Sequence, residues 1–440
     1  MGDIESIEKD MTVSKIYESY EKKQEEHPTR SIGASILGHP CTRYLWYLFR
    51  HCTKESFNGR ILRLFETGDI EEDRLVADLR RIGCNVIVTD DTDQQFHVSA
   101  CGGHVSGYLD GCLIGLPEAP KTWHVLECKS HNDKNFKKLV REGVKKGFPK
   151  HYCQMMVYMH LTGMERALYI AANKNDDTLY KERINYNKEE AEAMLDRAKN
   201  IVTSMNAPMR IAEKPDYYVC KHMCSATQLC FGPETPIAVL PIPFKSCRQC
   251  CHATPLLVGN NGEWLCEKHC RGLSMEDQLK ACDDHLILPG LLATYEPIDS
   301  GIDQNGNEYI QFSNEDLGKW THGQASGMFK TEELMKLPIS LLSNEMLNQA
   351  KETFNAEAGN PDDLLGDYLN SVEIWSGPLS KSAIETAWKE KYGDELSDCI
   401  PLRKLNTVTY SIAEYVGGRI ITADIPERKA EIREKKQENK

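Results

Sequence analysis

The chain has 440 residues, 40% hydrophobic and 27% charged, which is the composition of a globular protein with room for roughly two or three domains. Its formal net charge of −13 argues against broad, non-specific nucleic-acid binding and is compatible with a local basic groove or a metal-bridged phosphate site. No apolar run reaches the roughly 18 residues of a membrane span, and the acidic start "MGDIESIEKD" lacks the apolar core of a signal peptide. We therefore expect a cytoplasmic protein with no membrane partner.

The predicted elements follow one another in an α/β order. Residues 1–30 form a charged lead-in, and the aromatic run "CTRYLWYLFR" and a helix that ends at Gly83 come next. The pattern then predicts strands within 84–89, 95–100, 104–115 and 123–130, helices near 133–146 and 150–163, a strand at 166–174 and a helix at about 187–205. This order predicts an α/β sandwich with a mixed sheet.

Cysteine usage divides the rest of the chain. Eight of the 17 cysteines fall between Cys220 and Cys270, in tight spacings that indicate metal ligation. Without a secretion signal we expect a reducing compartment, which argues against disulfides. The expected segments are a lead-in at 1–30, an α/β core at 31–215, a Cys cluster motif at 216–235 that closes the core, a zinc-ribbon-like module at 244–285 and a C-terminal region at 286–440 without a readable motif.

Charged side chains occupy positions where the pattern predicts burial. In "HVLECKS", Glu127 and Lys129 are two residues apart on a strand, so both project from the same face. Asp110 in "GYLDGCLIG" is flanked by apolar residues, which favours a carboxylate in mid-strand over an Asp-Gly hairpin turn. Glu72 lies on the inward face of its helix, three residues before Leu75.

These side chains suit a hard divalent cation. Three converging carboxylates hold Mg²⁺ or Mn²⁺, and a neighbouring lysine orients or deprotonates a water and stabilises charge on a phosphate. On the next helix, Gln154 and Tyr158 are four residues apart and project together. The competing interpretation is a buried salt bridge beside a helix-start charge.

The combined pattern resembles the PD-(D/E)XK nuclease superfamily over roughly residues 31–285. The signature is Asp110 followed by Glu127-Cys128-Lys129. Three flanking features make the resemblance more specific, namely Gly68-x-x-x-Glu72, Gln154-x-x-x-Tyr158 and the entry "CTRYLWY". The sequence looks closest to RecB-like and lambda-exonuclease-like enzymes, in particular phage-encoded exonucleases with a Cys metal cluster, and the expected fold is a restriction-endonuclease-like core with appended Cys-rich metal-binding modules.

The resemblance implies a role for each matching residue. Glu72, Asp110, Glu127 and the main-chain carbonyl of Cys128 would bind Mg²⁺ or Mn²⁺, and the side chain of Cys128 would point to the opposite face. Lys129 would position the attacking water, and Gln154 and Tyr158 would hold the phosphate or the scissile strand. One wall of the DNA groove would be a basic segment with Lys134, Lys137, Lys138, Arg141, Lys145 and Lys146.

The resemblance also implies a [4Fe–4S] cluster that links a cysteine before the core to three cysteines after it. Its ligands would be Cys41, Cys220, Cys224 and Cys230. The late spacing Cys-x3-Cys-x5-Cys is one residue longer than the usual one, and His222 lies inside it. Zinc on the same thiolates, or with His222 as a ligand, therefore stays an alternative.

A second metal site is predicted from spacing alone. Cys247-x2-Cys250 and Cys266-x2-His269 match a zinc ribbon, in which a "GNNG" turn separates the two halves. Neighbouring cysteines compete for the same register, Cys251 with Cys250 and Cys270 with His269.

The sequence therefore predicts a metal-dependent DNA exonuclease that resects DNA ends for recombination or replication of a phage or mobile element, in the host cytoplasm. One alternative is an endonuclease or a DNA-trimming nuclease of CRISPR adaptation, and another is a catalytically inactive DNA-binding or interaction protein. The expected partner is DNA, as duplex ends or single strands. A recombination or annealing protein and further copies of the chain are additional candidates.

Overall fold

The computed structural model describes residues 2–22, 30–232, 239–292, 294–315 and 318–337, residues 342, 348, 351 and 352, and strands at 357–358, 403–405, 409–416 and 419–424. It divides into two compact units. The first unit comprises residues 1–226 and 252–279, and the second comprises residues 227–251 and 280–440. Among the helices described, none is long and apolar enough to cross a membrane.

A five-stranded mixed sheet forms the centre of the first unit. Its order is β2 (Asn85–Ile87), β5 (Gly111–Ile114), β6 (His124–His131), β7 (Arg166–Asn173) and β8 (Leu179–Asn185). β6 and β7 are parallel, and the other neighbours are antiparallel, so the predicted mixed sheet is confirmed. The sequence did not predict β8, because "LYKERIN" has three consecutive charged residues in place of a period-two apolar pattern. Charged residues of this kind are typical of an edge strand.

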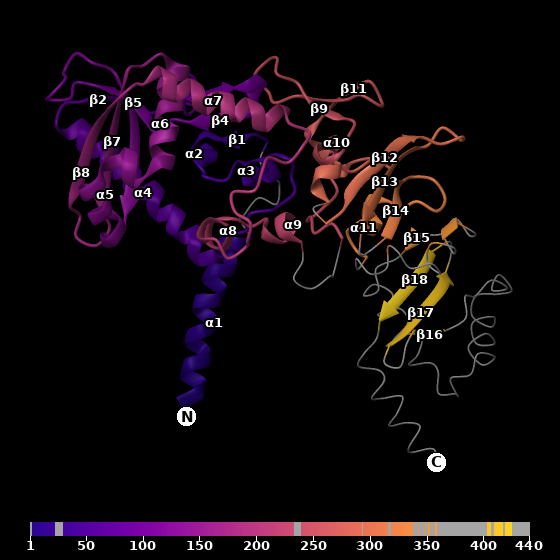
Figure 1. Ribbon diagram of the computed structural model, residues 1–440. Helices are drawn as coiled ribbons and strands as arrows, with labels where there is room; N and C mark the ends of the chain where they lie inside the picture. The colour runs from indigo at the N-terminus through magenta and orange to yellow at the C-terminus, as the bar shows by residue number, and fades with distance from the viewer. Residues whose placement is uncertain are drawn as a thin grey trace. The chain divides into compact units, whose positions relative to one another are not determined.

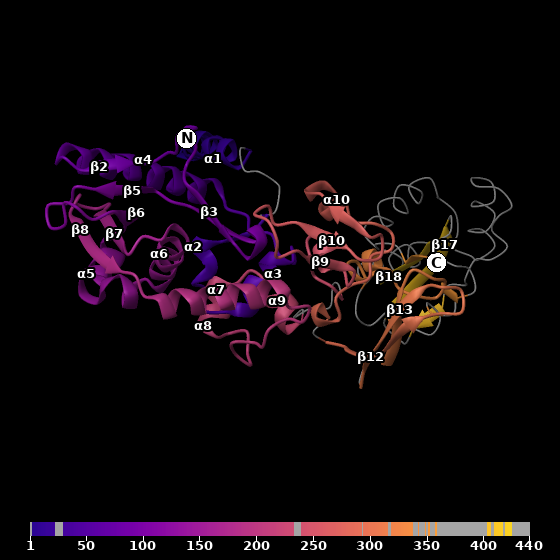
Figure 2. The same cartoon turned by 90° about the horizontal axis from the view of Figure 1, so that it is seen from above.

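Helices cover both faces of this sheet. The long helix α4 (Gly59–Arg81) lies on one face, and α5 (Asp133–Gly147) and α6 (Pro149–Thr162) lie on the other (Figure 2). α7 (Lys188–Thr203) packs against α6. The inward face of α4 and one face of the strands share an apolar cluster of Leu75, Val76, Leu79, Cys84, Val86, Leu113, Leu116, Leu126, Cys128, Leu168, Ile170 and Ala172.

A smaller sheet precedes the main one. It has the order β1 (Ile32–Gly33), β4 (Val105–Tyr108) and β3 (His97–Ala100), with the short helices α2 (Ala34–Leu37), α3 (Thr42–Phe49) and η1 (Cys101–Gly103) around it. The chain leaves β4 at Tyr108 and enters β5 of the main sheet at Gly111. Asp110 therefore lies at the crossing between two sheets, and the expected mid-strand position is wrong, as is the hairpin turn.

The N-terminal helix α1 (Gly2–Glu21) packs on the first turns of α4 (Figure 1). The contact requires glycine at position 59, because a Cβ there would lie 2.2 Å from the carbonyl oxygen of Tyr17. Glu21 accepts a hydrogen bond of 2.6 Å from the Gly59 amide. Helix α8 (Tyr218–Met223) comes shortly before residue 226, where the chain leaves the first unit.

The remaining part of the first unit is a three-stranded antiparallel sheet of β9 (Ala253–Pro255), β10 (Trp264–Cys266) and β11 (Arg271–Leu273), followed by α10 (Met275–Lys280). Trp264 is fully buried and packs against Phe49 and His104, with the guanidinium of Arg50 over its ring. This sheet is thus part of the packed core of the first unit.

The described residues of the second unit include two β-sheets. The unit also holds α9 (Thr227–Phe231), η2 (Cys247–Gln249), η3 (Pro289–Leu291) and α11 (Thr331–Leu334). One sheet is formed by β12 (Glu296–Ile302), β13 (Glu308–Asn314) and β14 (Gly318–Gly323), and another by β15 (Glu357–Ala358), β18 (Arg419–Asp424), β17 (Thr409–Val416) and β16 (Arg403–Leu405). The rings of Phe312 and Trp320 stack with their centroids 4.9 Å apart. Tyr295 and Phe329 meet the Trp320 ring edge-on.

Removal of the Leu126 side chain should destabilise the first unit. Leu126 is fully buried between α4 and the sheet, so Leu126→Ala should lower the free energy of unfolding by about 2–5 kcal/mol. Leu179 on β8 is 50% exposed, and Leu179→Ala should cost less than about 0.5 kcal/mol. Urea unfolding of both variants measures the difference, and equal losses would contradict the proposed core.

Candidate active site

The charged pair predicted on one strand face is present on β6. The ammonium of Lys129 contacts Glu127 Oε1 and lies 3.7 Å from Asp110 Oδ2. It also donates a hydrogen bond of 2.9 Å to the main-chain carbonyl of Cys128. Burial alone would lower the pKa of Lys129, but the carboxylates of Glu127 and Asp110 outweigh burial and raise it. Lys129 is therefore a cation at neutral pH.

Asp110 is fixed to β6 by a main-chain contact. Its carboxylate is buried, and Oδ2 accepts a hydrogen bond of 2.7 Å from the Cys128 amide. Asp110 lies in the segment between the two sheets, and its hydrogen bond with the Cys128 amide places it next to Lys129. The side chain of Cys128 belongs to the apolar cluster under α4, so it points away from the carboxylates as expected.

Glu72 approaches the same charges from α4. Its side chain is half-buried, and burial, with Asp110 as the next cause, raises its pKa to about 7. The ammonium of Lys129 opposes this rise. Because Glu72 interacts electrostatically with Asp110 and Lys129, we count this carboxylate of α4 as part of the same site.

Glu127 is the most deeply buried member of this group. It is completely inaccessible to solvent, and burial raises its pKa above the ordinary value although Lys129 opposes the rise. Oε1 contacts the Lys129 ammonium, whereas Oε2 has no hydrogen-bond partner among the described residues. A buried carboxylate oxygen without a donor is costly unless a cation satisfies it.

The donor set therefore fits a divalent cation. Glu72, Asp110, Glu127 and the Cys128 carbonyl all offer oxygen, which Mg²⁺ and Mn²⁺ prefer. Two of these carboxylates, Glu72 and Glu127, have raised pKa values, to which the charge of Asp110 contributes. A bound cation would lower both pKa values.

Helix α6 brings Gln154 and Tyr158 to the same face of the sheet. Both side chains are buried, and Gln154 Nε2 donates to the Tyr158 hydroxyl at 3.3 Å. That hydroxyl donates to the Tyr108 carbonyl at 2.8 Å, and its close approach requires glycine at 107, where a Cβ would lie 2.6 Å from it. Burial, with Glu127 as the next cause, raises the pKa of Tyr158, which stays a neutral donor.

Three residues beside the site were not predicted. Tyr169 on β7 places its hydroxyl 2.8 Å from His131 Nε2 and 2.9 Å from His151 Nδ1. The sequence carries a signal for two of them, since His131 is four residues after Glu127 on one strand face and His151 is three residues before Gln154 on one helix face. Tyr169 lies on the next strand, 38 residues after His131 and 18 residues after His151, and carries no local signal.

The predicted DNA-binding residues lie on α5, and most have intramolecular partners. Lys137 pairs with Asp133 at 2.7 Å, and Lys145 pairs with Glu190 at 2.7 Å. Arg141 contacts Glu142, and Lys138 donates to the Gly147 carbonyl at 2.7 Å. Such exposed pairs are weak enough to be exchanged for phosphate contacts, so the DNA-binding role of Lys134, Lys137, Lys138, Arg141, Lys145 and Lys146 stays a prediction.

The predicted iron–sulfur ligands lie in both units. In the first unit, the segment around Cys41 packs against the segment that holds Cys224. His39 Nε2 lies 3.0 Å from the Met223 carbonyl, and Thr53 Oγ1 lies 2.7 Å from Ser225 Oγ. Cys41 and Cys220 are buried and Cys224 is partly buried, whereas Cys230 belongs to the second unit. The set Cys41, Cys220, Cys224 and Cys230 stays a prediction.

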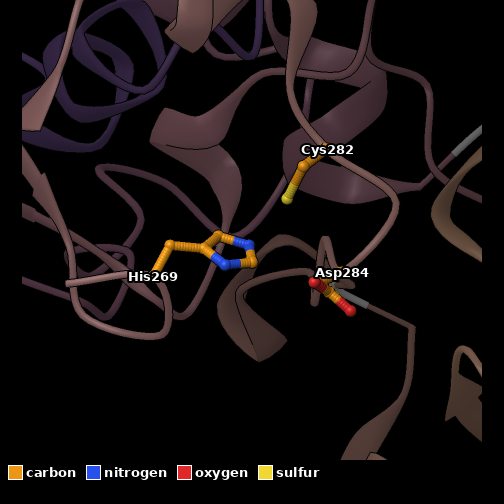
Figure 3. A group of neighbouring side chains, drawn as sticks. All are labelled: His269, Cys282 and Asp284. Atoms are coloured by element: carbon orange, nitrogen blue, oxygen red, sulfur yellow. The ribbon is translucent and has the colours of Figure 1, made fainter. Parts of the chain in front are cut away.

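The predicted zinc ligands are also divided between the units. Cys247 and Cys250 lie at the two ends of η2 in the second unit, and Cys250 Sγ accepts a hydrogen bond of 3.4 Å from the Leu286 amide. Cys266 and His269 belong to the first unit. Figure 3 draws His269 of the first unit together with Cys282 and Asp284 of the second unit. The zinc set stays a prediction.

No family model matches the chain, and no curated protein sequence matches it. Solved structures similar to it include LHK-Exo in complex with dAMP and an alkaline exonuclease (LHK-Exo) from Laribacter hongkongensis, each with 14% identity and a TM-score of 0.30 over 42% of this chain and about nine-tenths of that chain. A third is SSO0001, with 18% identity and a TM-score of 0.29 over 50% of this chain and 96% of that one. Likenesses of this extent carry no argument about activity.

The raised pKa of Glu72 predicts a pH-dependent stability without metal. The folded state holds this proton more tightly than the unfolded state, so the stabilisation is fully present below about pH 4.5 and is lost as pH rises through about 7. In EDTA, the melting temperature should fall from about pH 5 to about pH 8, and Glu72→Gln should make this fall smaller.

Glu71→Gln is the matched control, because Glu71 is the adjacent helix residue and pairs with Arg74 on the outer side. It should keep the wild-type pH dependence. A Glu72→Gln variant with the same slope as the wild type would show that Glu72 is not in the environment described.

Proposed function

We propose that the chain is a divalent-metal-dependent deoxyribonuclease of the PD-(D/E)XK type. The observation that carries the proposal is the Lys129 ammonium in contact with the buried Glu127 carboxylate, with Asp110 3.7 Å away and Glu72 electrostatically coupled to both Asp110 and Lys129. A salt bridge alone would not need a second carboxylate, Asp110, beside the ammonium, nor would it leave Glu127 Oε2 without a hydrogen-bond donor among the described residues.

The residues supply complementary parts of phosphodiester hydrolysis. When bound to Glu72, Asp110, Glu127 and the Cys128 carbonyl, Mg²⁺ or Mn²⁺ would supply Lewis-acid polarisation of the phosphate and a more acidic water. Lys129 is protonated, so it acts as a donor that orients the water and stabilises the developing negative charge rather than as a base. Gln154 and Tyr158 would hold the phosphate or the scissile strand from α6. Tyr158 would do so by exchanging its hydrogen bond to the Tyr108 carbonyl for one to the phosphate.

The finer proposal is an exonuclease that resects DNA ends for recombination or replication of a phage or mobile element. Its support is the motif order, with Glu72 before and Gln154 and Tyr158 after the Asp110, Glu127 and Lys129 core. The DNA would lie along the basic residues of α5, and a recombination or annealing protein would be its partner.

Replacement of Lys129 tests the reaction. Lys129→Ala should reduce Mg²⁺-dependent cleavage of linear duplex DNA by about 10²–10³-fold, because it removes a preorganised charge at the reacting phosphate. Lys181→Ala is the control. Lys181 lies on the edge strand β8 and pairs with Glu118, so its replacement should leave the cleavage rate unchanged. Cleavage by Lys129→Ala at the wild-type rate would contradict the assigned site.

The form of the DNA separates the kinds of nuclease. An exonuclease should degrade linear duplex and spare covalently closed circles in the same Mg²⁺ buffer. Cleavage of closed circles would replace the finer proposal with an endonuclease, and trimming of only a few terminal nucleotides would favour a DNA-trimming enzyme. DNA binding without cleavage of any form would favour an inactive DNA-binding protein.

We also propose that the chain carries a [4Fe–4S] cluster on Cys41, Cys220, Cys224 and Cys230, and zinc on Cys247, Cys250, Cys266 and His269. Anaerobically purified protein should be brown and contain more iron than zinc, and Cys220→Ser should lose the iron and keep the zinc. A colourless protein with zinc at both sites would replace iron by zinc in the first set.

A further inference from the structure

A second group of hydrogen-bonded side chains lies beside Lys129, on the sheet face that carries Glu127. Tyr169 on β7 is the register partner of Glu127 on β6, and it interacts electrostatically with both Lys129 and Glu127. Its buried hydroxyl lies 2.8 Å from His131 Nε2 and 2.9 Å from His151 Nδ1. The predicted catalytic set does not use any of these three residues.

The chemistry of one hydroxyl between two rings fixes their protonation. Tyr169 has one proton, so it donates to one imidazole and accepts from the other. The ring that accepts must be neutral. When the donating ring is neutral too, both rings carry their proton on the same type of nitrogen, either Nδ1 in both or Nε2 in both. Burial, with Lys129 as the next cause, lowers the pKa of His131 to about 4 and of His151 to about 3, which agrees with neutral rings.

The group joins the elements that carry the site. His131 is two residues from Lys129 on β6, and His151 is three residues before Gln154 on α6. The rings are packed as well as hydrogen-bonded. The ring centroid of Phe148 lies 5.3 Å from that of His151, on which it stacks, and 4.6 Å from that of His131. The Tyr169 hydroxyl on β7 is therefore hydrogen-bonded to both β6 and α6.

We propose that His131, Tyr169 and His151 are positioning residues that hold the Lys129 strand and the Gln154 helix at the spacing the reaction needs. The inference rests on the proposed nuclease function and deepens it. The three residues act through Lys129 and Gln154 and do not touch the substrate. Loss of the hydroxyl would leave the fold and DNA binding in place and misalign the groups that act on the phosphate.

Tyr169→Phe tests the role, because it removes only the hydroxyl. With linear duplex DNA and Mg²⁺, kcat should fall about tenfold while KM stays within about twofold of the wild type. Tyr180→Phe is the matched control, since Tyr180 donates to Glu182 at 2.8 Å on the neighbouring strand β8 and should change neither constant. Equal kcat values for Tyr169→Phe and the wild type would overturn the inference.

Nitrogen NMR of the imidazoles gives a readout independent of activity. In the wild-type protein near pH 7, His131 and His151 should each show a single neutral tautomer, and the two tautomers should be of the same type. In Tyr169→Phe, each ring should lose this restriction and show mixed tautomers. Opposite tautomers in the wild type, or an imidazolium at either position, would overturn the inference even if the variant were too unstable to assay.

The two failures are distinguishable. If Lys129→Ala cleaves DNA like the wild type, the proposed function fails and the positioning role fails with it. If Lys129→Ala is inactive and Tyr169→Phe has the wild-type kcat, only the positioning role fails.

Discussion

The contact of the Lys129 ammonium with the carboxylate of Glu127 is the interaction on which the candidate site depends. A fully buried carboxylate would be too costly to ionise alone, and a protonated Glu127 would be a poor cation ligand. Lys129 offsets part of this cost, and its own charge is stabilised by Asp110. The strand β6 can therefore present charge in the interior of the unit without a compensating water shell.

Everything else at the site is arranged around this strand. The Cys128 amide holds Asp110, the Cys128 carbonyl accepts from Lys129, and the Cys128 side chain anchors the strand in the apolar cluster under α4. One residue thus uses its amide, its carbonyl and its side chain for three different purposes. The opposite layer, α6, contributes neutral donors rather than charge, which limits the repulsion that a bound phosphate would meet.

The sequence predicted those parts of the site that depend on local periodicity. Glu127 and Lys129 share a face because a strand alternates, and Glu72 turns inward because it lies one helical turn before Leu75. It could not predict that Asp110 lies between two sheets, because β4 and β5 are close in the sequence and nothing local shows that β4 pairs with β1 and β3 whereas β5 pairs with β2 and β6. The link between Tyr169 and the two histidines was missed for the same reason, and β8 because its charged residues conceal an edge strand.

The parallel pairing of β6 and β7 has a consequence for how the chain folds. β5 and β6 are antiparallel neighbours, so the segment that carries Asp110 and the one that carries Glu127 can meet through a short loop. Tyr169 reaches its neighbours only after α5 and α6 have crossed over the sheet, which closes a much longer loop and is intrinsically slower. From these loop lengths we expect Asp110 and Glu127 to come together earlier in folding than α6 becomes aligned over them.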